Sequence, residues 1–196
     1  MMDGIKKRKE QKREDIRRAA LELFQTYGFK KVSINEIAQH AGVSQVTVYN
    51  HFGSKEELIR DVMKWFTSDL VAKYTAIINS DLPYLDKLES IVMDKTAIIS
   101  QFHGELVQQV MKADPQLQSF IDDLYNNKIK PSIISFFNEG AELGYIHKKY
   151  SADAIMFYFE VVRRGLGSIP DISERMAKEP DTAKEIIDIM TYGLNG

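Results

Sequence analysis

The sequence predicts an all-α protein of about nine helices, in which a small three-helix head precedes a larger helical body. Apolar residues recur at helical spacing along almost all of the 196 residues. Serine caps and glycine stops divide the first 60 residues into short helices. No segment shows the alternation of apolar and polar residues that is typical of a half-buried strand. We place the head at residues 1–54, with a basic arm at residues 1–9, and the body at residues 55–196.

The first predicted helix has one apolar face, and Gly28 follows it as a C′ stop. The face consists of Ile16, Ala19, Ala20, Leu23, Phe24 and Tyr27. Ser33 and Glu36 then form a capping box, so a second helix begins at about Ile34 and runs to Gly42. Its inward residues are Ile34, Ile37, Ala38 and Ala41. A third helix, capped by Ser44, runs to Phe52 and stops at Gly53.

The body is predicted to hold the remaining helices. The longest runs from Lys55 to Asn79, roughly 37 Å at about 1.5 Å per residue, and Pro83 breaks the pattern after it. Asp114 caps another helix, and Pro131 lies inside it, so we expect a kink or break there. Further helices are expected at residues 84–101, 105–112, 151–168 and 181–193.

The composition is that of a folded protein without disulfides, since 44% of the residues are hydrophobic and none is cysteine. Neither a membrane span nor a signal peptide is predicted, and we expect a cytoplasmic protein. Residues 1–60 hold 12 Lys and Arg against 8 Asp and Glu, whereas the rest of the chain holds 14 against 20. Only the head is therefore expected to meet a polyanion.

The second and third helices, joined by the turn A-G-V-S, have the arrangement of a helix-turn-helix. In such a unit the N-terminal residues of the second helix enter the major groove of DNA. Those residues begin with Gln45, whose amide can pair with adenine, and with Val46 and Thr47, whose methyl groups can contact thymine. The groups that can donate to phosphates are Tyr49, Asn50, His51 and Lys55.

The basic arm has two possible roles, as a solvated, mobile tail or as a segment that contacts phosphates or the minor groove. The basic residues at the start of the chain are Lys6, Lys7, Arg8, Lys9, Lys12 and Arg13.

The stretch S-I-N-E-I-A-Q-H-A-G-V-S-Q-V-T-V-Y-N-H-F-G-S-K-E-E-L resembles the DNA-binding signature of the TetR family of bacterial transcriptional regulators. The I-A-x-x-A-G-V-S core, the Y-x-H-F close and the S-K-E-E-L start of the next helix all agree. The resemblance implies an all-helical homodimer with an N-terminal DNA-binding head and a C-terminal body for ligand binding and dimerisation. It implies DNA contacts at Ser33, Ser44, Gln45, Thr47, Tyr49, His51 and Lys55.

The apolar residues of the body can belong to its core, to a dimer interface or to a ligand cavity between helices. Candidates for lining a cavity are Trp65, Phe66, Met93, Phe102, Phe120, Tyr125 and Phe137. The last two predicted helices carry apolar residues on more than one face, as an isologous four-helix interface requires. Candidates for that interface are Met156, Phe159, Val162, Ile186, Ile189 and Met190.

These features predict a transcriptional repressor that binds a near-palindromic operator as a homodimer and responds to a small molecule. The expected partners are double-stranded operator DNA, a second copy of the chain and an unidentified small-molecule effector. No membrane partner, cofactor or metal ion is expected, and His103 and His147 lack neighbouring ligands in a recognisable motif. One alternative is a constitutive DNA-binding regulator without a ligand. Another is a small helical enzyme, although no Ser/His/Asp set, carboxylate pair or P-loop motif is present.

Overall fold

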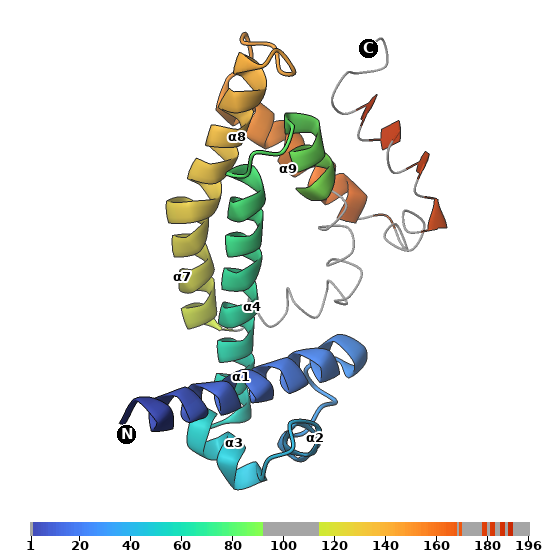
Figure 1. Ribbon diagram of the computed structural model, residues 1–196. Coiled ribbons are helices and arrows are strands. Elements are labelled where there is room, and N and C mark those ends of the chain that lie inside the picture. The colour runs from blue at the N-terminus through green and yellow to red at the C-terminus, as the bar shows by residue number, and fades with distance from the viewer. Residues whose placement is uncertain are drawn as a thin grey trace. The chain divides into compact units, whose positions relative to one another are not determined.

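The computed structural model describes residues 2–91 and 114–167 and, beyond them, positions 169, 178–179, 181–182, 185–186 and 188–189. The described residues are helical and contain no strand (Figure 1), which confirms the predicted all-α class. The elements are α1 (Met2–Tyr27), α2 (Ile34–His40), α3 (Gln45–Phe52), α4 (Lys55–Ile78), α7 (Pro115–Leu124), a π-helical turn (Tyr125–Ile129), α8 (Lys130–Glu142) and α9 (Ala152–Gly167). Residues 84–91 are also helical. The rest of the helices predicted at 84–101 and 105–112, and much of the one at 181–193, lies outside the described residues.

Two compact units divide the described chain. The N-terminal unit holds residues 2–70 and 114–122, and the C-terminal unit holds residues 71–91 and those from 123 onwards. This division departs from the predicted boundary between residues 54 and 55, because the first part of α4 and most of α7 belong to the N-terminal unit.

Helix α1 includes the basic segment that was predicted as a separate arm, so residues 2–9 are helical and are not a tail. Lys, Arg, Glu and Gln have high helix propensity, which explains why the helix extends so far before its apolar face begins. That face is buried at Ile16 and Phe24, but Tyr27 is 58% exposed, so its predicted inward position is wrong. The chain turns directly after Tyr27, and Phe29 continues the packing, with its ring centroid 5.0 Å from that of Phe24.

Both serine caps of the helix-turn-helix form as predicted. The Ser33 hydroxyl accepts the Glu36 N–H at 3.2 Å, and Glu36 Oε2 accepts the Ser33 N–H at 2.7 Å. The Ser44 hydroxyl likewise accepts the Thr47 N–H at 3.1 Å. Between the two helices Gly42 has a φ of 64°, a conformation that residues with a Cβ rarely adopt, so the sharp turn depends on glycine.

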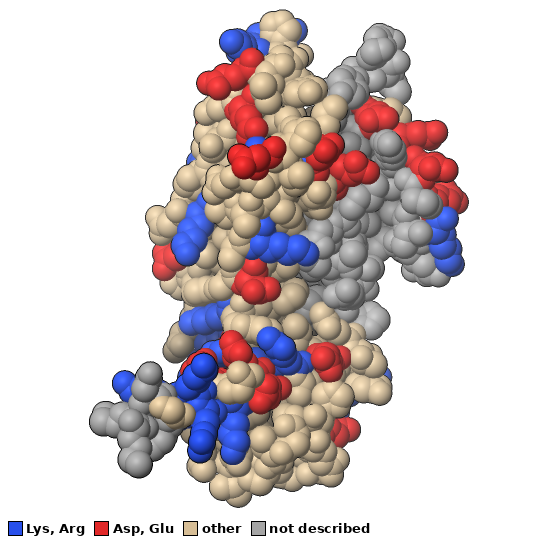
Figure 2. Space-filling model, viewed as in Figure 1, with Lys and Arg blue, Asp and Glu red and all other residues tan. Residues whose placement is uncertain are grey.

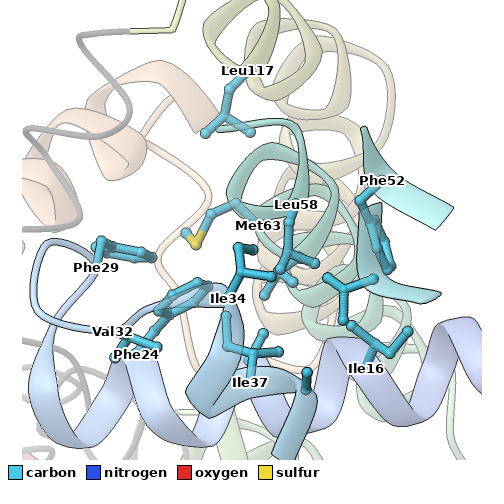
Figure 3. Packing of buried hydrophobic residues seen from close by; sticks show 14 residues of the cluster. Ile16, Phe24, Phe29, Val32, Ile34, Ile37, Phe52, Leu58, Met63 and Leu117 are labelled. Atoms are coloured by element: carbon cyan, nitrogen blue, oxygen red, sulfur yellow. The ribbon is translucent and has the colours of Figure 1, made fainter. Parts of the chain in front are cut away.

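The core of the N-terminal unit gathers apolar side chains from α1, α2, α3 and α4 (Figure 3). Its members include Ile16, Phe24, Phe29, Val32, Ile34, Ile37, Val48, Phe52, Leu58, Val62, Met63 and Leu117. Burial of each large side chain contributes about 1.5–3 kcal/mol to stability. Leu117 comes from α7 and has no exposed surface, so this core is completed by a residue far along the chain.

The break predicted at Pro131 is a π-helical turn. The Lys130 N–H bonds to the carbonyl of Tyr125, which is five residues earlier instead of four. Proline has no N–H, and its ring crowds the carbonyl four residues before it, which accounts for a wider turn at this point.

The core of the C-terminal unit is built around Tyr84, whose ring stacks on Phe136 and Tyr145 at centroid distances of 4.5 and 5.1 Å. Beside it the buried Lys87 Nζ donates to Glu139 Oε1 at 2.7 Å. Burial, together with the charge of Glu139, raises the pKa of the Tyr84 phenol to about 12. The phenol is therefore a neutral part of this core.

Candidate nucleic-acid interface

Helix α3 buries one side and exposes the other. Val48 and Phe52 are buried in the core, whereas Val46 is 66% and Tyr49 48% exposed. Large apolar side chains that cluster on a surface are typical of contact sites. The outward side chains of α3 are Gln45, Val46, Tyr49 and Asn50. They are all among the predicted DNA contacts.

The predicted contacts Ser33, Ser44 and Thr47 also have roles within the fold. The hydroxyls of Ser33 and Ser44 accept the capping N–H groups of α2 and α3, so both residues fix where these helices begin. Thr47 is half-buried, with its Oγ1 2.8 Å from Ser44 Oγ.

One contact of Gln45 was not predicted. Its Nε2 donates to Oδ1 of Asn35 on α2 at 2.7 Å. The contact depends on the angle at which α2 and α3 meet, and the spacing of residues along the chain does not reveal that angle.

The exposed side of α3 is uncharged and lies beside basic groups. The helix holds no Lys, Arg, Asp or Glu, whereas Lys and Arg side chains gather on the N-terminal half of α1 (Figure 2). Burial lowers the pKa of His51 at the end of α3, and the nearby charges of Lys9, Arg13 and Lys12 lower it further. Lys55, the first residue of α4, lies with its Nζ 3.4 Å from the carbonyl oxygen of Lys30.

Asp61 on α4 holds α1 in place. Its carboxylate accepts hydrogen bonds from the Arg13 guanidinium and from Arg17 Nε, the latter at 2.5 Å. Burial alone would raise the pKa of Asp61, but the hydrogen bonds from the two arginines outweigh it and hold that pKa below its ordinary value. Arg13 also lies over the ring of Phe52, 5.2 Å from its centroid, so the same cluster supports the end of α3.

An open pocket of about 320 Å³ lies beside this cluster. Its lining residues are Arg13, His51, Phe52, Glu57, Arg60, Asp61 and Lys64. Most of them are charged, and none belongs to the predicted apolar cavity. The pocket is therefore part of the surface around α3 and does not correspond to the expected ligand site.

The residues predicted to line a cavity fall in both units. Trp65 and Phe66 are half-buried in the N-terminal unit, where Phe66 packs against the core and Phe120 lies under Lys64 Nζ at 5.3 Å. In the C-terminal unit Phe137 is buried in the core and Tyr125 is 42% exposed. Met93 and Phe102 lie outside the described residues.

The residues predicted for a dimer interface are placed only in part. Met156 packs against the core of the C-terminal unit, whereas Phe157 and Val161 of the same helix are 72% and 52% exposed. Ile186 is half-buried and Ile189 is 46% exposed. The side chains of Phe159 and Val162, and the whole of Met190, lie outside the described part.

The described residues contain neither a membrane-spanning helix nor a cluster of potential metal ligands. No described helix combines the length and apolar character that crossing a membrane requires. Within the same residues, no three His, Cys, Asp or Glu side chains lie together as potential metal ligands.

Several known proteins with similar sequences or folds are transcriptional regulators. Residues 16–62 match the model of the bacterial regulatory proteins, tetR family. The chain is 26% identical over 159 residues to the HTH-type transcriptional repressor KstR2 of Mycobacterium tuberculosis, and the match covers 79% of this chain and 78% of the relative.

Two solved structures share the fold. NemR of E. coli in its reduced form has a TM-score of 0.67 at 16% identity, over 91% of this chain and 97% of that one. FadR of Bacillus subtilis in complex with stearoyl-CoA has a TM-score of 0.61 at 16% identity, over 92% and 98%. The segment that matches the family model is the one that presents α3 to solvent beside the basic part of α1. Residues 16–62 therefore carry the DNA-binding region of the tetR family of bacterial regulatory proteins, and the chain is a DNA-binding transcriptional regulator.

Proposed function

We propose that this regulator is a repressor that binds a near-palindromic operator as a homodimer and changes its operator affinity when a small-molecule effector binds. The observation that carries the proposal is the exposed, uncharged face of α3 beside basic groups. Such a face can bond to base edges while the neighbouring cations hold phosphates. This arrangement supports sequence-specific binding over attachment to any polyanion.

The predicted contacts on α3, together with Lys55, have the following parts in this proposal. The Gln45 amide pairs with N6 and N7 of adenine, and Val46 and the Thr47 methyl contact thymine methyl groups. Further donors hold the phosphates on either side: Tyr49, Asn50, His51 and Lys55.

The homodimer forms through α9 in this proposal. Phe157 and Val161 are four residues apart, so they share one face of the helix, and both are exposed. An isologous interface would bury this face against its symmetry mate. Met156 packs against the core of the C-terminal unit, so in this proposal it holds α9 on that core and does not contact the partner.

The effector response is supported by relatives and by α4. KstR2 is a repressor, and a protein of this fold, FadR, is known in complex with stearoyl-CoA. Helix α4 is continuous and contributes residues to both units, so a ligand-dependent shift of α4 would change the spacing of the two α3 helices in a dimer. The alternative is a regulator that binds its operator constitutively.

Selection of bound sequences from a random double-stranded DNA pool, at about 150 mM salt, tests the proposal. We expect a palindrome whose half-sites lie about 34–36 Å apart, or a multiple of that distance. Binding that salt abolishes, with no enriched sequence, would contradict sequence-specific regulation. The selected operator then serves to screen small molecules for release. An operator affinity that no tested compound changes at saturation would favour the constitutive alternative.

A further inference from the structure

Asn35 on α2 faces Gln45 at the start of α3, and the two exposed carboxamides are joined by the 2.7 Å bond from Gln45 Nε2 to Asn35 Oδ1. We propose that Asn35 is a positioning residue for DNA recognition, which fixes the amide of Gln45 in the orientation that reads adenine and rejects guanine. The inference rests on the proposed function, because it concerns the base that Gln45 reads.

The hydrogen-bonding capacity of Gln45 carries the inference. A glutamine amide has two N–H donors and one carbonyl oxygen. The bond to Asn35 uses one donor, so one N–H and Oε1 remain for a base. Adenine presents one acceptor, N7, and one donor, N6–H₂, in the major groove, and this matches what remains. Guanine presents two acceptors, N7 and O6, so the held amide can donate to only one of them while its own oxygen faces the other.

The backbone at Asn35 is held in a fixed position by its neighbours. Ser33 forms the capping box at the start of α2, and Ile34 and Ile37 are buried in the core. Asn35 therefore projects from a fixed helix end. A free glutamine side chain loses rotamer entropy when it binds, and a contact that restricts it beforehand reduces that loss.

The experiment compares selected DNA sequences among four proteins: the wild type, Gln45→Ala, Asn35→Ala and the double variant. The wild type should prefer adenine to guanine about tenfold at one position of each half-site, and Gln45→Ala should abolish this preference. Asn35→Ala should relax the same position, admit guanine there and leave every other position unchanged. The double variant should relax no further than Gln45→Ala alone.

Two further variants separate positioning from a merely structural effect. Asn35→Asp keeps an acceptor in the same place and offers no donor, so it should retain the adenine preference while its negative charge weakens binding to all sequences alike. Gln39→Ala removes an exposed amide from the same helix one turn later, and it should leave all base preferences unchanged.

Three outcomes would overturn the inference. Relaxation at a different position in Asn35→Ala would mean that Asn35 reads a base itself. An unchanged preference in Asn35→Ala would mean that the contact does not orient Gln45 on DNA. An unchanged preference in Gln45→Ala would place adenine reading elsewhere. A wild-type protein that enriches no sequence would instead overturn the proposed function, so the two failures are distinguishable.

Discussion

His51 lies at the end of α3 among the charges of Lys9, Arg13 and Lys12, and its pKa is low in the free protein. A DNA phosphate beside the imidazole would favour its charged form and raise that pKa, so binding would take up a proton. We therefore expect operator affinity to rise as pH falls from about 8 to about 6, and this pH dependence to disappear in His51→Gln. Titrations of operator at fixed salt measure it. The same pH dependence in His51→Gln would assign the proton to another group.

A substitution at Asp61 tests whether its bonds to Arg13 and Arg17 hold α1 in place. Asp61→Asn should lower the free energy of unfolding by about 1–3 kcal/mol at neutral pH, because it weakens the bonds to Arg13 and Arg17. The pKa of Asp61 is depressed in the folded state, so its contribution is present above the unfolded pKa of about 3.9 and is lost as pH falls through the folded value.

Urea unfolding of both proteins at neutral pH and at about pH 2.5 measures this difference. The difference between wild type and Asp61→Asn should narrow in acid. The matched control is Asp69→Asn, at an exposed position of the same helix, which should show little difference at either pH. If wild type and Asp61→Asn differed in the free energy of unfolding by the same amount at both pH values, the charge of Asp61 would be excluded as the source of the difference.

Local signals explain which residues could be predicted from the sequence. Ser33 and Ser44 cap helices through atoms three residues away, so a capping box is visible in the chain itself. Asn35 lies ten residues from Gln45, and Asp61 lies 48 residues from Arg13. These pairs form only because helices cross in space, and no spacing rule describes that crossing.

At the scale of elements, α1 is a structured basic helix. Lys9 and Lys12 lie near the end of α3, whereas Lys7 and Arg18 project from the other side of α1. Lys9→Gln with Lys12→Gln should weaken binding to every sequence and lower the salt dependence by about 1–2 phosphate equivalents, at roughly 0.9 each. Lys7→Gln with Arg18→Gln removes the same amount of positive charge, but it should change the affinity and its salt dependence less. Equal effects of the two pairs would indicate that only net charge matters.

The buried ion pair between the 84–91 helix and α8 predicts an asymmetry. The side chain of Lys87 is 7% exposed and that of Glu139 34% exposed. Glu139→Leu leaves a buried ammonium without its partner, at a cost of about 3–5 kcal/mol, whereas Lys87→Met leaves a carboxylate that reaches water. Thermal unfolding should therefore rank Glu139→Leu as the more damaging, with the double variant closer to wild type. The reverse order would show that the carboxylate is the costly group.

For the whole molecule, Leu117 makes the N-terminal unit depend on α7. Leu117→Ala should destabilise the protein by about 2–5 kcal/mol and weaken operator binding, although the residue lies far from α3 in sequence. Urea unfolding and operator titration measure the two effects. Leu143→Ala, at a 58% exposed position of the C-terminal unit, is the control and should change stability by no more than about 0.5 kcal/mol. Equal effects of both variants would contradict the role of Leu117.

The same residue shows why the domain boundary was harder to predict than the helices. Periodicity and caps locate α2, α3 and α4 well, and the predicted Lys55–Asn79 helix differs from α4 by one residue. Leu117 has the same apolar character whether it packs in one unit or the other. For the same reason, the predicted cavity residues Phe66 and Phe137 could be recognised as inward residues but not assigned to one cavity.

The position of Leu117 also sets an order of events during translation. A ribosome that has added residue 54 has synthesised every side chain of α3. Leu117, which completes the core that supports α3, is still 63 codons away. At about 5–20 residues per second, roughly 3–13 s pass before Leu117 is added. A nascent or prematurely terminated chain would therefore hold its recognition residues on an incomplete core. Competence to occupy DNA would arise only once synthesis has reached α7.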